Sequence, residues 1–273
     1  MTENIKIIQK KELALLKEFI RVCNKHNLKY YILGGTLLGA VRHGGFIPWD
    51  DDIDVGMPRN DYEKLMNLYE SEFETPYKLV SEKNSSDFTK AFMNLQDTTT
   101  KIVMKYSNIA HEESIWMDIF PIDGMPKNYL KNKIHKLRYL SSRMLVQLSQ
   151  FNKIVNQNKE NRPFIEKIII STAKVINFEK LLTYRKMQKK YINVLSKYDM
   201  NEYYSGNLTG AYKLKEVVPS EYFGEGVKIL FEDIEVNAPT EYLNYLSAIY
   251  GSNYMDLPPE DKRIPHNYDI LQL

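Results

Sequence analysis

The chain contains very little cysteine and no long apolar segment. Its single cysteine, Cys23, excludes an internal disulfide and a zinc site made of cysteine thiolates, and it is typical of a reducing compartment. A membrane-spanning helix needs about 20 consecutive apolar residues, and no uncharged stretch of the chain is that long. Residues 1–13 lack the apolar core of a secretory signal. We therefore expect a cytoplasmic protein.

The net charge is only +2 over 273 residues, but it is unevenly distributed. Residues 126–197 contain seventeen Lys and Arg against three acids, a local balance of +14 that leaves −12 for the rest of the chain. Such asymmetry indicates an acidic catalytic part and a basic surface for an anionic partner. The hydrophobic content of 43% is ordinary for a globular protein.

The spacing of apolar residues predicts alternating helices and strands. Residues 10–27 have helical periodicity, with Cys23 expected as a packed core thiol. The segment "YYILGG" (30–35) predicts a buried strand that ends in a glycine turn, and Thr36 is expected to N-cap the next helix. Further strands are predicted at 52–57, 77–82, 91–97, 101–106 and 114–123, helices at 59–73 and 239–251, basic helices across 127–198 and a polar tail at 252–273.

Four aspartates follow this glycine-rich helix within a few residues: Asp50, Asp51, Asp52 and Asp54. In a strand, alternate side chains share a face, so Asp52 and Asp54 are expected to project together. Like charges this close repel one another, so a cation is expected beside them. Carboxylate oxygens together with substrate phosphates are the ligands that Mg²⁺ prefers. A solvated acidic loop is the simpler alternative.

The predicted helix start at Gly34, Gly35 and Thr36 suits a phosphate group. Its backbone N–H groups have no partner inside the helix, and the helix dipole is positive at this end. A glycine pair alone or an acidic cluster alone is weak evidence. The order strand, glycine pair, helix and acid-alternating strand is much more specific.

The longer string "GGTLLGAVRHGGFIPWDDDIDVGM" resembles the LicD family, and so do "WMDIFPID" and "YGSNYMDLPPEDKR". That family belongs to the nucleotidyltransferase superfold shared with DNA polymerase β. The resemblance implies an α/β fold with a nucleotidyltransferase (polymerase β-like) mixed-sheet core. It covers the N-terminal half and the C-terminal end, and the basic middle carries no matching motif.

The resemblance also implies roles for individual carboxylates. Asp52 and Asp54 would bind Mg²⁺ or Mn²⁺, and Asp50 is a further candidate ligand. Asp118 would be the third carboxylate of the superfold, as a metal ligand or as the base for an acceptor hydroxyl. Asp123 competes for that role, but its position after a proline favours a turn cap. Sixteen residues separate Gly35 from Asp52, more than in many members of the superfold.

Relatives of this kind transfer a phospho-alcohol, typically phosphocholine, from a CDP-linked donor to a hydroxyl of a lipid-linked, cell-surface glycan. Relatives in the fukutin group transfer ribitol phosphate. The acceptor class includes teichoic acid, capsule and lipopolysaccharide precursors of bacteria. Two other functions stay open: transfer of a nucleotide to a small molecule or sugar, and metal-dependent binding without catalysis.

Three further residues are candidates for binding the donor. Arg42 follows the glycine helix start by about two turns and is expected to reach a donor phosphate, although a surface charge is an equal alternative. Trp49 is expected to stack on a ring or a cation, or else to plug the strand. Arg263, in the tail, is a candidate phosphate clamp. His43 is expected to be a solvated histidine.

The residues group into three expected parts. Residues 1–125 form the catalytic core, 126–198 a basic helical subdomain, and 199–273 a C-terminal part that packs on the core. The basic helices favour peripheral binding to an anionic membrane on its inner face, with shallow insertion at Leu137, Leu140, Ile168 and Ile169. A solvated basic face is the alternative. No nucleic-acid partner is expected, because no RNA- or DNA-binding module is recognisable.

Overall fold

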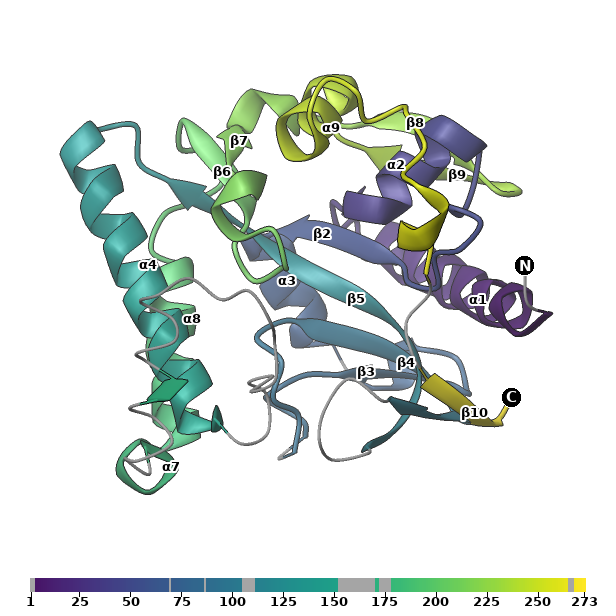
Figure 1. Cartoon of the computed structure of the whole chain (residues 1–273), viewed down its shortest axis with the longest axis horizontal. Coiled ribbons are helices and arrows are strands. Elements are labelled where there is room, and N and C mark those ends of the chain that lie inside the picture. Colours follow the sequence, from purple (N-terminus) through teal and green to yellow (C-terminus); the bar gives the residue numbers. More distant parts are fainter. Residues whose placement is uncertain are drawn as a thin grey trace.

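The computed structural model describes residues 3–68, 70–85, 87–104, 111–151, 170–171, 178–264 and 268–273. Within these ranges, an eight-stranded mixed sheet runs through the middle of the molecule, with helices packed around it (Figure 1). The strands are β1 (Tyr31–Ile32), β2 (Asp54–Pro58), β3 (Tyr77–Val80), β4 (Met93–Met104), β5 (His111–Met125), β6 (Tyr204–Asn207), β7 (Val218–Pro219) and β10 (Tyr268–Gln272), and β8 (Val227–Phe231) and β9 (Ile234–Ala238) form a separate hairpin. The helices are α1 (Glu3–Lys25), α2 (Gly34–His43), α3 (Arg59–Met66), α4 (Tyr129–Ser149), α7 (Phe178–Leu181), α8 (Tyr184–Leu195) and α9 (Tyr242–Tyr250).

The parallel pair β2 and β5 lies at the centre of the sheet. Asp54 is in register with Asp118, and Val55 with Ile119. On the other side of β5, the antiparallel strand β4 places Asn94 opposite Asp118. Because alternate side chains point to opposite faces, the two aspartates and the asparagine share one face, and the apolar residues share the other.

Helix α1 covers part of the apolar side of this core. It contacts β4 and β5, and Leu15, Leu16, Phe19 and Cys23 along it are completely buried. The expected core position of Cys23 is therefore confirmed, and burial raises the pKa of its thiol. The helix begins at Glu3, earlier than the predicted residue 10.

Helices α4 and α8 pack side by side at one end of the molecule (Figure 1). Tyr139 of α4 and Tyr191 of α8 are buried between them, and both hydroxyls donate to the carbonyl oxygen of Leu208. The expectation of helices in the basic segment is confirmed for these ranges. The division of the chain into three parts stays a prediction.

The two strands predicted at 91–97 and 101–106 overlap a single strand, β4, which ends at Met104. Its pairing with β5 shifts register between Asp97 and Ile102. One threonine, Thr100, satisfies backbone groups that the shift leaves unpaired. Thr100 donates to the carbonyl oxygen of Asp97, and its hydroxyl accepts from the N–H of Ile115 at 2.8 Å.

Two other predicted boundaries were wrong. Strand β2 begins at Asp54, so Asp52 precedes the strand instead of lying in it. The helix that starts at Arg59 ends at Met66 and is followed by a 3₁₀ turn at Glu70–Glu72. The tail, for which only polar character was predicted, contains a 3₁₀ turn at Glu260–Lys262 and strand β10, which pairs with β4.

Asp123 does not cap a turn, contrary to prediction. It lies completely buried in β5, where the guanidinium of Arg59 donates to both of its carboxylate oxygens, at 2.7 and 2.5 Å. The Arg59 side chain is only 10% exposed. A two-point ion pair of this kind neutralises a carboxylate that could not otherwise be buried. Asp123 therefore stabilises the junction of α3 and β5.

We expect Asp123→Asn to lower the free energy of unfolding by about 3 kcal/mol, because it leaves the Arg59 charge buried without its partner. The measurement is urea denaturation followed by circular dichroism. Lys64→Met is the matched control, since it removes an ion pair to Asp61 of 2.8 Å from a lysine that is 64% exposed. It should cost less than about 1 kcal/mol. Equal losses in the two variants would contradict the prediction.

Candidate active site

The start of helix α2 lies directly against Asp54. Gly34 has φ +52°, and a side chain there would place its Cβ 3.1 Å from an oxygen of the Asp54 carboxylate. Only glycine accepts this backbone angle without strain and allows so close an approach. The backbone N–H of Asp54 donates to the Thr36 hydroxyl at 2.8 Å, and the N–H of Leu33 donates to the Asp54 carbonyl oxygen.

This arrangement corrects the prediction that Thr36 N-caps the helix. The N-cap position is Leu33, and no side chain caps the helix there. Thr36 instead joins the first turn of α2 to the first residue of β2. Gly44 ends the helix: it has φ +75°, and its N–H donates to the carbonyl oxygen of Ala40.

Three side chains hold the Asp118 carboxylate. The Asn94 amide donates to Oδ1, the Lys90 ammonium lies 3.6 Å from the same oxygen, and the Trp116 side chain forms a further hydrogen bond. Burial raises the pKa of Asp118, while Lys90 and the two hydrogen bonds oppose that rise. Asp118 is therefore a carboxylate of fixed orientation with a cation beside it.

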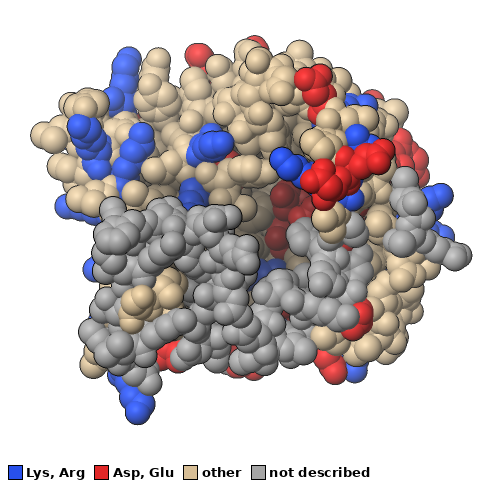
Figure 2. All heavy atoms as spheres, viewed as in Figure 1, with Lys and Arg blue, Asp and Glu red and all other residues tan. Residues whose placement is uncertain are grey.

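Negative charge is concentrated around Asp54. Burial raises its pKa well above the ordinary value, and Asp52, Asp118 and Asp50 raise it further. The same acids act on Glu12 of α1, which is 2% exposed and whose pKa burial also raises. Figure 2 shows acidic side chains at the wall of a hollow near the middle of the molecule. Added positive charge would relieve this repulsion.

Asp50 and Asp52 come to this region from the loop before β2. A Cβ on Gly35 would lie 2.7 Å from Oδ2 of Asp50, so this carboxylate faces the first turn of α2. Among the described residues, no group of three or more His, Cys, Asp or Glu side chains is arranged to hold a metal ion. Mg²⁺ commonly takes one or two carboxylates and completes its shell with substrate phosphates and water. Asp54 and Asp118, in register on neighbouring strands, fit that smaller requirement.

The other predicted donor-binding residues, Arg42, Trp49 and Arg263, lie near the C-terminal end of α2. Arg42 donates to the carbonyl oxygens of Tyr254 and Asp256, each at 3.1 Å. The Arg263 guanidinium lies 5.3 Å from the centre of the Trp49 ring. Burial lowers the pKa of Arg42, and nearby Arg263 lowers it further. The fold thus brings two guanidiniums, 221 residues apart in sequence, to one place beside Trp49.

His43 lies at the same end of α2 and is exposed, as expected for a solvated histidine. Its ring accepts a hydrogen bond from Arg42 at 3.0 Å and approaches the Trp49 ring edge-on. Burial lowers its pKa, and Arg42 acts in the same direction. A neutral imidazole that orients Arg42 is consistent with these contacts.

Comparisons with known proteins show which family the chain resembles. A sequence model of the nucleotidyltransferase domain of LicD, FKTN and FKRP matches residues 27–167, about half of the chain. The lipopolysaccharide cholinephosphotransferase LicD of Haemophilus influenzae is 31% identical over 259 residues, which cover 93% of this chain and 92% of that protein. The chain belongs to the LicD family. The human ribitol 5-phosphate transferase FKRP is 45% identical over 42 residues, 15% of this chain and 8% of that protein.

Lys90 is a residue of the candidate site that no sequence pattern indicated. It belongs to the loop that precedes β4, and α8 holds this loop from outside. The Tyr184 hydroxyl donates to the carbonyl oxygen of Thr89 at 2.7 Å, and the Gln188 amide donates to that of Lys90 at 3.1 Å. The Lys90 ammonium also lies 4.2 Å from the centre of the Trp116 ring. In this LicD-family chain, helix α8 therefore positions a cation at Asp118.

A second loop, residues 207–216, reaches the site from the end of β6. Arg143 of α4 donates to the carbonyl oxygens of residues 208, 209 and 210. The Glu216 carboxyl is buried in this loop and hydrogen-bonds to Asn207 and to the backbone of Tyr212. The Tyr212 ring packs edge-on against Tyr250, 5.4 Å away between centres. Neither Arg143 nor Glu216 stood out in the sequence.

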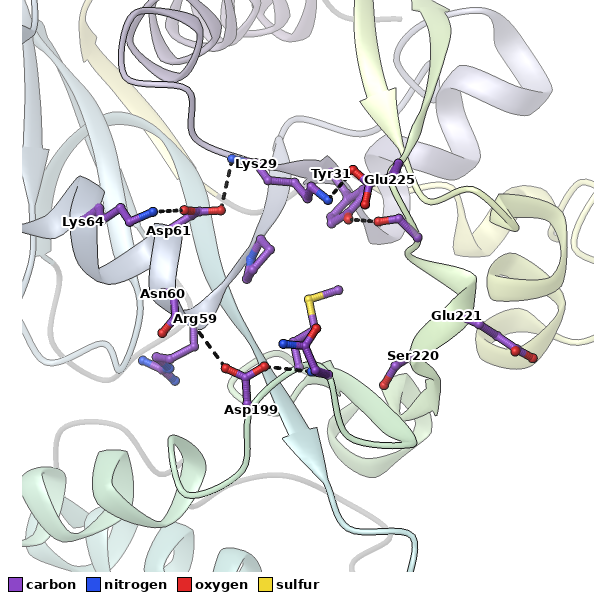
Figure 3. A pocket seen from close by; sticks show the side chains of 14 residues that line it. Lys29, Tyr31, Arg59, Asn60, Asp61, Lys64, Asp199, Ser220, Glu221 and Glu225 are labelled. Atoms are coloured by element: carbon purple, nitrogen blue, oxygen red, sulfur yellow. Dashed lines mark hydrogen bonds and ion pairs between the residues drawn. The ribbon is translucent and has the colours of Figure 1, made fainter.

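A pocket of about 530 Å³ lies at the opposite end of β2 from Asp54 (Figure 3). Its wall includes Pro58, the last residue of that strand. Its charged groups are largely paired with one another: Lys29 with Glu225 at 2.9 Å and Lys64 with Asp61 at 2.8 Å. None of the predicted site residues lines it. The carboxylate site and this pocket are separate features.

We expect Glu216→Gln to stabilise the protein increasingly as the pH rises from 5 to 8. Burial raises the pKa of Glu216 to about 8, so the folded protein keeps a proton that the unfolded chain has lost above its ordinary pKa of 4.5. The wild type therefore loses stability with rising pH in this window, by up to about 1.4 kcal/mol per pH unit for this group. Glu216→Gln removes that slope.

The measurement is urea denaturation of both proteins at pH 5, 6, 7 and 8. Glu221→Gln, on an exposed turn, is the matched control and should leave the slope unchanged. A wild type and a Glu216→Gln variant with parallel pH dependence would refute the prediction.

Proposed function

We propose that this LicD-family chain transfers a phospho-alcohol, phosphocholine first, from a CDP-linked donor to a hydroxyl of a cell-surface glycan precursor. The observation that carries the proposal is the register of Asp54 with Asp118 in a chain that aligns with a lipopolysaccharide cholinephosphotransferase over nearly its whole length. The acceptor is proposed to be lipid-linked lipopolysaccharide, with teichoic acid and capsule precursors as the other members of the class.

The proposed cofactor is Mg²⁺, with Mn²⁺ as its substitute, and the nucleotidyltransferase type of core is part of the same proposal. Asp54 and Asp118 would hold the ion, joined by Asp52 and Asp50 from the preceding loop. Such an ion neutralises the donor diphosphate and stabilises the leaving CMP. The raised pKa of Asp54, which burial and then Asp52 cause, supports a site that requires added positive charge.

The chain's own groups would orient the donor. The first backbone N–H groups of α2, at Gly34, Gly35 and Thr36, belong to the positive end of the helix and suit a phosphate. Lys90, held at Asp118 by the contacts described above, would neutralise charge on the transferred phosphoryl group. In-line transfer gains most of its rate from such positioning and electrostatic stabilisation.

The end of α2 opposite the glycines would bind the rest of the donor. It lies about 12 Å along the helix axis at 1.5 Å per residue, a distance suited to a nucleotide. Among the described residues, neither Arg42 nor Arg263 forms an ion pair with a carboxylate. Both guanidiniums retain donors for an anion, and Trp49 offers a ring face beside them.

The deciding experiment incubates the purified protein with Mg²⁺, lipopolysaccharide or teichoic acid, and CDP-choline, CDP-ethanolamine, CDP-glycerol or CDP-ribitol in turn. Release of free CMP with one donor, together with a modified glycan, is the expected result. An acceptor that carries CMP itself would indicate nucleotide transfer instead. Absence of turnover with every donor, despite metal binding, would favour a non-catalytic binding protein.

We expect Asp54→Asn and Asp118→Asn each to reduce Mg²⁺-dependent CMP release by about 1,000-fold or more, because a neutral amide does not hold the charge of a divalent ion. Circular dichroism should show that both variants remain folded. Asp61→Asn, a carboxylate on α3 away from the site, is the matched control and should retain activity. Near-wild-type turnover in either site variant would remove the metal assignment.

Lys90→Met should reduce kcat by about 100-fold, as expected for loss of one group that stabilises charge in the transition state. Lys83→Met is the matched control, since Lys83 lies in the same part of the chain but contacts Asn67. A Lys90→Arg variant should recover part of the lost rate. If Lys90→Met raises KM and leaves kcat unchanged, the lysine binds the donor without acting on the transferred group.

A further inference from the structure

Helix α4 has two apolar faces, and only one of them is packed. The inner face carries His135, Tyr139, Ser142 and Val146, all buried, toward α8 and the loop at Leu208. A surface helix needs one apolar face to pack on the rest of a protein. The second apolar face of α4 is therefore not explained by packing within the described part of the chain.

This second face forms an exposed, mainly apolar ridge. Leu130 is 65% exposed and Leu137 69% exposed, values far above those of packed leucines. From Leu130 onward the members recur at three- and four-residue spacing, so they lie along one side of the helix. The α4 ridge consists of Tyr129, Leu130, Ile134, Leu137, Leu140 and Met144.

Positive charge lies along both sides of the α4 ridge and, at Lys133, within it. Helix α4 contains no acidic residue, and its lysines and arginines near the ridge are exposed or half-buried: Lys131, Lys133, Lys136 and Arg138. Figure 2 shows Lys and Arg gathered on the end of the molecule that α4 forms. The neighbouring helix α8 adds four basic residues and no acid: Arg185, Lys186, Lys189 and Lys190.

Aromatic side chains mark the start of the ridge. Tyr129 is 71% exposed, and the Lys133 ammonium lies 4.6 Å from its ring centre. Tyr203 is 49% exposed, with Lys127 4.4 Å from its ring centre. Tyrosine and lysine beside apolar side chains are the residues that favour the boundary between lipid headgroups and acyl chains.

The geometry points to the α4 ridge as a docking surface for an anionic lipid bilayer, with the ridge in the headgroup boundary and the flanking cations on acidic headgroups. A helix that combines an apolar face with basic flanks binds such a boundary in the membrane plane. In the described part of the chain, no helix is long and apolar enough to cross a membrane. The inference extends beyond the proposed transfer reaction and does not depend on it.

Charge also argues against the alternative of a second copy. A symmetric dimer through this face would place the basic flanks of two copies against each other, since a two-fold contact is self-complementary. Like charges across a contact are unfavourable. An anionic bilayer, in contrast, neutralises both flanks at once.

The test is co-sedimentation of the full chain with two kinds of vesicle, one of phosphatidylcholine alone and one that also contains about 30 mol% phosphatidylglycerol. The phosphatidylglycerol gives the second kind a negative surface, like that of an anionic membrane leaflet. Binding is expected with phosphatidylglycerol at low salt, and it should fall at least about tenfold at high salt. A double variant, Leu130→Ser with Leu137→Ser, should bind at least about tenfold more weakly while all charges remain. Lys133→Glu with Lys136→Glu should weaken binding by a similar factor.

The matched control is Leu230→Ser with Leu257→Ser, which removes two leucines that are 59% and 52% exposed elsewhere on the molecule. It should bind the vesicles as the wild type does. Thermal unfolding confirms that each variant folds. The inference is overturned if the wild type stays in the supernatant with phosphatidylglycerol, if the α4 variants bind normally, or if the control loses as much binding. The inference is also overturned if the wild type is a dimer and the Leu130→Ser, Leu137→Ser variant is a monomer.

Discussion

The constraint on which the site depends is the pairing of two acidic side chains in register on parallel strands. Asp54 and Asp118 occupy neighbouring positions on β2 and β5, in a place where burial favours neutral groups. Parallel register leaves no freedom to move one carboxylate away from the other. Three groups offset this repulsion: the side-chain amide of Asn94, the ammonium of Lys90 and the positive end of the α2 dipole.

Helices α4 and α8 contribute to the carboxylate site of the sheet by holding the two loops that reach it. Helix α8 holds the carbonyl oxygens of Thr89 and Lys90, and α4 holds the loop at 208–210 through Arg143. These are contacts of side chains with backbone, so they fix the path of each loop without constraining which side chains the loops carry toward the site. The basic helices therefore serve the carboxylate site on their inner side, whatever their outer side contacts.

Much of the core could be predicted because its signals are local. The glycine pair, the alternating acids and the apolar runs each lie within a few residues, so helix α2, the β2 strand and the strand that carries Asp118 were predictable. Asp123 was misassigned because its neighbours in sequence suggest a turn, whereas its partner Arg59 lies 64 residues away. Lys90 could not be chosen, since α8, almost 100 residues further along, sets its position. β10 was missed because its short sequence is mostly polar or exposed, and its pairing with β4 decides its conformation.

That last strand has a consequence for how the protein can be handled. β10 hydrogen-bonds to residues 101–104 of β4, which otherwise would present unpaired backbone N–H and C=O groups at a sheet edge. Open edges of this kind recruit strands from other chains and lead to aggregation. Arg263 lies between α9 and β10, so the same strand also tethers the segment that brings this guanidinium to Trp49. A shortened C-terminus would thus leave an unpaired sheet edge and release the segment that brings Arg263 to Trp49. Affinity tags are therefore better attached at the N-terminus.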